Sequence, residues 1–342
     1  MGPGRNKLQI AAGAQMRATF AAQGVKRRGC MSQASAWSLR EVWTRKLLYP
    51  GHTLPTAIAP VLVAIGLAHH DGVFAAGPAA LAFMAGWLIQ FGGLVTDNYE
   101  NLRREPDDRE HPELVQAVAS GLVSLAILRA TIVATYGLAV IVGFALLAMA
   151  GWPVIVIGVL SILASWAYSA GPWPVGRHGC ADPLFFLFFG TMSVIGAYYV
   201  QATTVLGPEH WRQALPLTAV AASLPVGALI TDILIIDDIR DRDFDVVKGK
   251  NTIAVRFGRG WSRAEFLCLL AFAFLTPLWL WLGFGFSAWV LLPWVTLPIA
   301  GLVTRAVWIR NRFEELVPMT PRMAMLTVAF SICLAAELAV TG

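Results

Sequence analysis

The sequence predicts an all-α polytopic membrane protein. Of its 342 residues, 57% are hydrophobic and only 14% are charged, whereas soluble domains contain roughly 45–50% apolar and about 25% charged residues. The mean hydropathy is +0.62, and the apolar residues gather in long runs. These observations exclude an ordinary soluble protein. They also exclude a disordered chain, because the apolar surface far exceeds what collapse requires.

About nine apolar segments are predicted to cross the membrane as helices. The hydrocarbon core is about 30 Å thick, so a helix needs about 20 residues to cross it. Pro55, Pro60 and Pro153 lie near the starts of the first and fourth segments, which are short; there a missing N–H costs little. The runs, each bounded by Gly, Pro or charged residues, lie near 53–70, 78–99, 120–148, 153–170, 183–203, 214–236, 263–284, 287–308 and 321–341.

The basic residues predict the orientation of the chain in the membrane. Nine Lys and Arg residues precede the first segment, and further groups follow the second, fourth, sixth and eighth segments. The loops after the first, third, fifth and seventh segments contain only Arg212. Because cytoplasmic loops carry the excess of Lys and Arg, the N-terminus is predicted to be cytoplasmic and the C-terminus to lie outside.

Residues 1–45 are predicted to be a basic, disordered N-terminal extension, and residues 46–342 a single transmembrane domain. The first thirty residues contain six basic side chains, no acidic one and no apolar run, unlike a secretory signal. We favour a translation start at Met31 over a transit-like leader. Cys30, Cys180, Cys268 and Cys333 share no metal-binding spacing and imply no disulfide framework. No basic and aromatic module of the kind that binds nucleic acid is present.

An acidic cluster follows the sixth segment and is the strongest candidate for chemistry. Asp237, Asp241 and Asp245 are spaced four residues apart, so on a helix they lie along one stripe. Like charges at this spacing repel each other, and acidic residues at a helix C-terminus oppose the macrodipole. A solvated helix end with alternating charge is the alternative interpretation, and the unfavourable macrodipole weakens it. Oxygen ligands of this kind suit Mg²⁺, which binds a few carboxylates together with substrate phosphates.

A second acidic cluster follows the second segment, on the same predicted side of the membrane. Asp97, Asn101 and Glu105 repeat the four-residue spacing, and Asp107 follows closely. By itself this cluster would pass as a solvated loop. Paired with the first cluster across one cavity, it is predicted to hold Mg²⁺ ions on a diphosphate and to neutralise charge as the diphosphate leaves.

Basic and aromatic residues near these clusters complete the candidate site. Lys248, Lys250 and Arg256 follow the sixth segment and are candidates to bind phosphate oxygens, although positive-inside topology alone would also explain them. We assign Arg240 and Asn98, which neighbour the acidic side chains, to the diphosphate as well. Tyr168, at the end of the fourth segment, is a candidate catalytic residue together with Lys248 and Arg256, although interfacial aromatics are common at that depth.

In their shared order, these residues resemble the UbiA superfamily of intramembrane aromatic prenyltransferases, most closely its MenA branch, the 1,4-dihydroxy-2-naphthoate polyprenyltransferases. The likeness covers the first six segments and the following loop, and more weakly the last three. Asp237, Asp241 and Asp245 match the family's second Asp-rich motif. The other matches are Asp238-Ile239-Arg240-Asp241, Gly249 to Arg256, Ala167 to Pro174, the aromatic run from Phe185 to Gln201, and Leu54-Pro55 with Pro60.

The first acidic motif departs from the family pattern. The family places Asn first and Asp four and eight residues later, and the MenA branch often has its last Asp ten residues on. Here Asp97 replaces the Asn, Asn101 replaces the middle Asp, and Glu105 or Asp107 fills the last position. Every substitute still offers an oxygen ligand, and the exchange between positions 97 and 101 conserves charge.

The resemblance implies a UbiA-like helical bundle that catalyses Mg²⁺-dependent prenylation of an aromatic ring. Ionisation of a polyprenyl diphosphate would leave an allylic carbocation, shielded from water by an apolar cavity and stabilised by aromatic faces. In the MenA branch the acceptor is 1,4-dihydroxy-2-naphthoate, which loses carbon dioxide in menaquinone biosynthesis. The enzyme would lie in the lipid bilayer of a bacterial inner membrane, with its active site on the cytoplasmic side.

Other functions remain open from the sequence. Another UbiA-type enzyme would use a different phenolic acceptor, such as a hydroxybenzoate, homogentisate or a secondary metabolite. A cation-coupled membrane carrier is the alternative from another class, because intramembrane acidic residues such as Asp232 and Glu337 often mark ion paths. Against a carrier, most carboxylates lie at the ends of the segments, and the sequence shows no inverted repeat with broken helices. A purely structural membrane protein would have no use for two acidic stripes.

Overall fold

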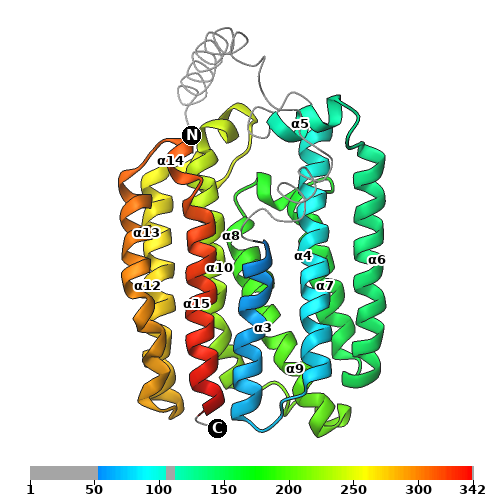
Figure 1. The fold of residues 1–342 in the computed structure, drawn as a ribbon, viewed down its shortest axis with the longest axis vertical. Helices are drawn as coiled ribbons and strands as arrows, with labels where there is room; N and C mark the ends of the chain where they lie inside the picture. The colour runs from blue at the N-terminus through cyan, green and yellow to red at the C-terminus, as the bar shows by residue number, and fades with distance from the viewer. Residues whose placement is uncertain (1–52, 105–111, 341–342) are drawn as a thin grey trace, which may run out of the picture.

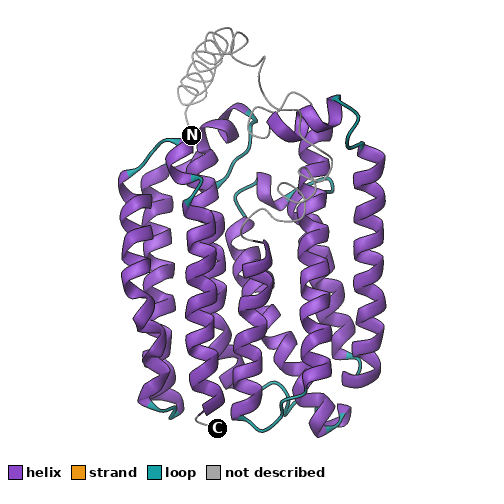
Figure 2. Cartoon of the chain, in the orientation of Figure 1, coloured by secondary structure: helices purple, strands orange, loops and turns teal. Residues whose placement is uncertain are grey.

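The computed structural model describes residues 53–104 and 112–340 and shows an all-helical bundle, with no strand among these residues (Figure 2). Four expectations lie outside the described residues. They are the N-terminal extension, the start at Met31, and the candidate ligands Glu105 and Asp107.

The described helices follow the predicted segments in order. The first half of the chain contains α3 (Thr53–His70), α4 (Ala76–Arg104), α5 (Pro112–Ala119), α6 (Leu125–Ala150) and α7 (Pro153–Ser169). The middle contains η3 (Val175–Arg177), α8 (Ala181–Leu184), the π-helix η4 (Phe185–Thr191), α9 (Met192–Leu206) and η5 (Pro208–His210). The remainder contains α10 (Leu217–Val247), α11 (Ile253–Phe257), α12 (Arg259–Phe284), η6 (Ala288–Thr296), α13 (Leu297–Ile309), α14 (Phe313–Leu316) and α15 (Met319–Val340).

Seven helices in the described part of the chain are long and apolar enough to cross a membrane. Two shorter apolar helices, Leu54–His70 and Pro153–Ser169, coincide with the first and fourth predicted segments. Local signals explain several boundaries. Pro153 begins α7, and the Ser124 hydroxyl accepts a hydrogen bond from the Ile127 N–H at the start of α6. The protein is therefore an integral multi-pass membrane protein, while the count of nine spans and the sides of the two termini stay predictions.

The helices run nearly parallel and surround α10, the most buried of the long helices (Figure 1). α12, α13 and α15 lie on one side of the bundle, and α4, α6 and α7 lie on the other, with α3 between the two groups (Figure 1). α3 packs along α15, although more than 200 residues separate them in the sequence. The bundle therefore brings early and late segments of the chain together.

Small residues allow two of these helix contacts to be very close. A Cβ atom built on Gly190 of η4 would lie 2.2 Å from the Gly227 Cα of α10. A Cβ atom built on Gly66 of α3 would lie 2.5 Å from the Ala335 carbonyl oxygen of α15. Helices inside membranes associate through such small-residue contacts, because lipid supplies no hydrophobic force between them.

α4 and α10 extend beyond the predicted apolar segments. α4 continues to Arg104 rather than ending near residue 99, and α10 continues to Val247 rather than ending near residue 236. Asp97, Asn101 and the stripe Asp237, Asp241 and Asp245 therefore all lie on regular helix. The predicted helical stripe after the sixth segment is confirmed, and these two helix ends lie at the same end of the bundle (Figure 1).

Candidate functional site

Carboxylates from the ends of α4 and α10 lie near one tyrosine side chain at the end of α7. Asp97 on α4 and Asp237, Asp238 and Asp245 on α10 are all close enough to Tyr168 for their charges to influence its hydroxyl. The Tyr168 ring packs against Gly176, where a Cβ atom would lie 2.9 Å from the ring. The structure therefore brings the described carboxylates of the two predicted clusters close to Tyr168.

Asp97 is oriented by two neutral donors. The Ser169 hydroxyl donates to Asp97 Oδ1 at 2.6 Å, and the Asn101 Nδ2 donates to Asp97 Oδ2 at 3.1 Å. The Asn101 contact spans one helical turn of α4, as the four-residue spacing predicts. Asp97 and Asn101 thus form one unit, fixed against the end of α7 by Ser169.

Arg240 pairs with two carboxylates of the second cluster. Its Nε and Nη2 donate to the two oxygens of Asp241 at 2.6 and 2.5 Å, and its Nη1 donates to Asp237 Oδ1 at 2.5 Å. The Thr320 hydroxyl of α15 also donates to Asp237 Oδ1, at 2.5 Å. One guanidinium group therefore offsets part of the negative charge of Asp237 and Asp241.

The loop after α10 is tied to the cluster by further cations. The Lys250 ammonium lies 2.8 Å from Asp245 Oδ1, and the Asp245 side chain is almost fully buried. Arg177 donates to the Lys248 carbonyl at 2.8 Å, and the Arg177 carbonyl accepts from the Asn251 N–H at 2.8 Å. Arg177 thus braces the segment after α7 against the segment after α10.

Two other predicted diphosphate ligands lie less centrally. Arg256 on α11 is exposed, and its guanidinium lies 5.8 Å from the Phe257 ring centroid. Asn98 is buried, and it shares the stripe of α4 with Val95 and Leu102, which pack with residues of α5 and α6. Asn98 therefore points about a quarter turn away from Asp97, since successive helix residues are about 100° apart. The Asn98 amide nitrogen has no hydrogen-bond partner within the described residues, and its assignment to the diphosphate stays a prediction.

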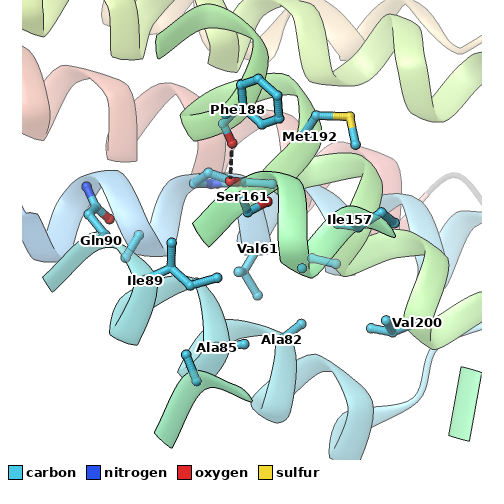
Figure 3. Close-up of a pocket in the computed structure, with 18 of the residues that line it drawn as sticks. Val61, Ala82, Ala85, Ile89, Gln90, Ile157, Ser161, Phe188, Met192 and Val200 are labelled. Carbon is cyan, nitrogen blue, oxygen red and sulfur yellow. Dashed lines mark hydrogen bonds between the residues drawn. The ribbon is translucent and has the colours of Figure 1, made fainter. Parts of the chain in front are cut away.

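An apolar pocket lies deeper in the bundle beside the acidic end. Its volume is about 130 Å³, and residues of α3, α4, α6, α7, η4 and α9 line it. Figure 3 shows that the lining includes the aliphatic side chains of Val61, Ile89, Ile157 and Val200. Among the few polar groups, the Gln90 amide donates to the Thr56 hydroxyl.

A row of aromatic rings connects this pocket to the acidic end. Phe189 lines the pocket and stacks on Phe185, with ring centroids 4.5 Å apart. Phe185 in turn packs edge-on against Tyr168 at 5.3 Å. These rings belong to the π-helix η4 and the end of α7, and π-helical turns occur often at functional sites. A ligand with a charged head and an apolar tail fits this arrangement.

The donor chemistry of the acidic end fits Mg²⁺. Its carboxylates, together with the Asn101 amide, offer oxygen ligands, which hard divalent cations require. Within residues 53–104 and 112–340, no three His, Cys, Asp or Glu side chains stand close enough to hold a metal ion by themselves. Mg²⁺ in phosphate-transfer sites is usually bound by one or two carboxylates plus substrate phosphates. The carboxylates present therefore fit Mg²⁺ that is bound together with a diphosphate.

A further acidic group lies inside the bundle and takes no part in this site. Asp232 of α10 is fully buried, and neither of its carboxylate oxygens has a hydrogen-bond partner in the described part of the chain. The charges of Glu265 on α12 and Asp182 on α8 act on it. Glu337, the other acidic residue considered for an ion path, lies near the end of α15 and accepts a hydrogen bond from the Ser287 hydroxyl at 2.7 Å.

Sequence reasoning missed Ser169, Thr320 and Arg177 as parts of the site. Ser169 follows Tyr168 within the matched segment from Ala167 to Pro174, so its position in that segment could have identified it as a site residue. Thr320 lies more than 80 residues after Asp237 at the start of an apolar helix, and nothing in its local sequence marks it.

Comparisons with known proteins show the family to which this chain is similar. The family model described as "UbiA prenyltransferase family" matches residues 57–333. A 1,4-dihydroxy-2-naphthoate octaprenyltransferase of Escherichia coli is 31% identical over 224 residues, which cover 64% of this chain and 70% of that protein. A protein of the same description from Mycobacterium tuberculosis is 28% identical over 289 residues, which cover 84% of this chain and 94% of that protein.

Solved structures share the fold at low sequence identity. A UbiA homolog from Aeropyrum pernix superposes with a TM-score of 0.62 at 19% identity, covering 86% of this chain and 98% of that one. A UbiA homolog from Archaeoglobus fulgidus, solved with DMAPP and Mg²⁺ bound, has a TM-score of 0.55 at 14% identity and covers 87% of this chain and 99% of that one. The helical bundle therefore has the same fold as these solved UbiA homologs.

Proposed function

This chain belongs to the UbiA prenyltransferase family, and on that premise we propose that it transfers a polyprenyl group from a polyprenyl diphosphate to 1,4-dihydroxy-2-naphthoate. The protein is a prenyltransferase in a membrane. The observation that carries the proposal is the position of Tyr168, which follows an aromatic row from an apolar pocket and stands next to Ser169, the hydrogen-bond donor to Asp97, with carboxylates of α10 nearby. A prenyl diphosphate needs both environments, one at each end of the molecule.

We assign the diphosphate to the acidic end of the bundle. Asp97, Asp237, Asp241 and Asp245 would hold Mg²⁺, as would Asn101, Glu105 and Asp107 in the first cluster. When bound, Mg²⁺ would neutralise the negative charge that grows on the departing diphosphate. A related archaeal UbiA homolog was solved with DMAPP and Mg²⁺ bound, which supports this assignment.

Basic side chains would complete the grip on the diphosphate. Lys250 and Arg240 already lie among the carboxylates, and their charges would attract the phosphate oxygens. Lys248 and Arg256 approach from the loop after α10. Because Arg240 now pairs with Asp237 and Asp241, it is expected to exchange part of that pairing for phosphate when the substrate binds.

The apolar pocket would receive the reacting end of the isoprenoid and exclude water from it. Tyr168, Phe185 and Phe189 present aromatic rings between the pocket and the carboxylates. Such ring faces stabilise a developing allylic cation, and the apolar walls keep water from capturing it. Gln90 and Thr56 supply polar groups for the hydroxyl or carboxyl groups of an aromatic acceptor.

The acceptor is proposed from the relatives. The bacterial relatives that cover most of this chain are described as 1,4-dihydroxy-2-naphthoate octaprenyltransferases. Their bacterial origin also supports a bacterial inner membrane, with the acidic end facing the cytoplasm. Another phenolic acceptor is the second candidate, because the first acidic motif departs from the family pattern. Family membership decides against the cation-coupled carrier.

The test incubates membranes containing the full chain with Mg²⁺, polyprenyl diphosphates of several lengths and a panel of phenolic acids. We expect a prenylated product from dihydroxynaphthoate whose mass shows loss of the carboxyl group. Asp241→Asn should lower product formation by about a hundredfold or more. Asp243→Asn is the matched control, because Asp243 pairs with Arg259 and Arg242 instead. No product from any pair of substrates would contradict the proposed function, and an active Asp241→Asn variant would contradict the metal assignment.

A further inference from the structure

A threonine from the helix α15 touches the second acidic cluster. The Thr320 hydroxyl donates to Asp237 Oδ1 at 2.5 Å and accepts from Arg240 Nη1 at 3.2 Å. Thr320 is 2% exposed and lies in the first turn of α15. One buried hydroxyl thus contacts both partners of the Arg240–Asp237 ion pair.

The same C-terminal segment holds Arg240 from another side. The Arg240 guanidinium lies 5.5 Å from the centroid of the Phe313 ring on α14, and Phe313 also packs edge-on against Phe244 at 5.3 Å. α14 and α15 therefore fix Arg240 through an aromatic face and a hydroxyl group. Both contacts come from residues that are distant in sequence from the acidic cluster.

The two carboxylate oxygens of Asp237 have different contacts. Arg240 Nη1 and the Thr320 hydroxyl both reach Oδ1, so Oδ2 takes part in neither contact. A carboxylate that is anchored through one oxygen presents the other in a fixed direction. Hydrogen bonds of this kind orient the ligands of metal sites, and their loss typically lowers metal affinity about 10- to 100-fold.

We propose that Thr320 is a positioning residue for the Mg²⁺–diphosphate site, and that it anchors Asp237 Oδ1 so that Oδ2 is presented to the metal. This inference rests on the proposed function, because it assumes that Asp237 is a metal ligand. It adds a residue from α15 to a site otherwise built from α4, α7, η4, α10 and the loop after α10. Thr320 itself touches neither substrate nor metal.

The experiment measures how Mg²⁺ protects the purified full chain from heat. Thermal unfolding is followed while Mg²⁺ is titrated at fixed inorganic pyrophosphate, and the Mg²⁺ dependence of prenyl transfer is measured in parallel. Thr320→Val keeps the shape and removes the hydroxyl, so the half-saturating Mg²⁺ concentration should rise about tenfold or more in both measurements. Thr320→Ser keeps the hydroxyl and should behave like the wild type.

Thr327→Val is the matched control. Thr327 is fully buried on the same helix, and its hydroxyl donates only to the Met323 carbonyl, at 2.9 Å. An unchanged Mg²⁺ requirement in Thr320→Val, or an equal shift in Thr327→Val, would overturn the inference. If Thr320→Val fails to fold, Thr320→Ala takes its place with the same expectation. A wild type without any Mg²⁺ and pyrophosphate dependence would instead contradict the proposed function.

Discussion

Asp97 and Asn101 behave as a single unit at the scale of the residue. Their side chains share a hydrogen bond of 3.1 Å, and Ser169 fixes the other oxygen of Asp97. The unit carries one negative charge, whichever of the two positions holds the carboxylate. The departure from the family pattern therefore changes where the charge sits along α4 by one turn, without changing how many ligands the cluster offers.

Exchanging the two residues is expected to be tolerated. In the double variant Asp97→Asn with Asn101→Asp, the amide and the carboxylate change places and keep their mutual hydrogen bond, so prenyl transfer should be retained or increased. Asp97→Asn alone removes the charge and should lower turnover about tenfold or more. Both variants are assayed for product in membranes at equal expression. An inactive double variant would show that the wild-type order of the pair is required.

The sequence could predict the residues whose spacing is local, and it could not predict those that act across the bundle. Asp97, Asn101 and the stripe from Asp237 to Asp245 follow from a four-residue period on a helix. Thr320 reaches Asp237 only because α15 packs against α10, and no local pattern encodes that contact. Asn98 follows Asp97 directly in sequence but lies on another face of the same helix, so its role stays a prediction.

At the scale of the element, the π-helix η4 depends on a close contact with α10. Seven residues from Phe185 to Thr191 form this wider turn, and it carries two of the rings between the pocket and Tyr168. Gly190 and Gly227 allow the two backbones to approach closely enough for that placement. The helix that carries Asp237 and the helix that carries Phe185 are thereby locked together.

A methyl group at Gly190 is expected to break this lock. Gly190→Ala would place a Cβ atom 2.2 Å from the Gly227 Cα, so the helices must separate, at a cost of about 1–3 kcal/mol in the free energy of unfolding. The thermal unfolding midpoint in detergent should fall accordingly. Gly137→Ala on α6 is the control, because nothing lies within 4 Å of its Cβ position. Equal midpoints for the two variants would refute the role assigned to the contact.

The elements themselves were largely predictable, because long apolar runs fix where helices lie. The apolar segments were predicted to end near residues 99 and 236, and the helices α4 and α10 continue past these points to Arg104 and Val247. Apolar length reports where a helix meets water, whereas a helix backbone bonds internally and can continue past that boundary. The sequence did not predict which parts of the helices depart from α-helical geometry. The π-helix η4 is one such part, and the 3-10 helix η6, which begins the eighth segment, is another.

At the scale of the whole molecule, the residues of the candidate site are gathered at one end of the helical bundle. Asp97, the stripe from Asp237 to Asp245, Tyr168 and the loop that carries Lys250 lie at one end, while the opposite end contains the turns before α4 and α10. Under the proposed function, the end with the acidic residues would face the compartment that supplies the diphosphate.

Thiol labelling tests this orientation. Cys180 is exposed two residues before Asp182, at the acidic end. In a variant that keeps Cys180 as its single cysteine, a membrane-impermeant maleimide should label inside-out vesicles and leave intact cells unlabelled. Glu209→Cys in an otherwise cysteine-free chain gives the reverse control, because Glu209 is exposed in η5 at the opposite end. Labelling of Cys180 in intact cells would contradict a cytoplasmic active site.

The contact between α3 and α15 has a consequence for biogenesis. A ribosome releases α3 into the bilayer long before it has translated α15, because chains emerge at about 5–20 residues per second. Until α15 is made, the contact between Gly66 and Ala335 and the hydrogen bond between Thr320 and Asp237 cannot form. A chain that stalls before the final helix would therefore remain in the membrane without these contacts, and its acidic end would be incomplete.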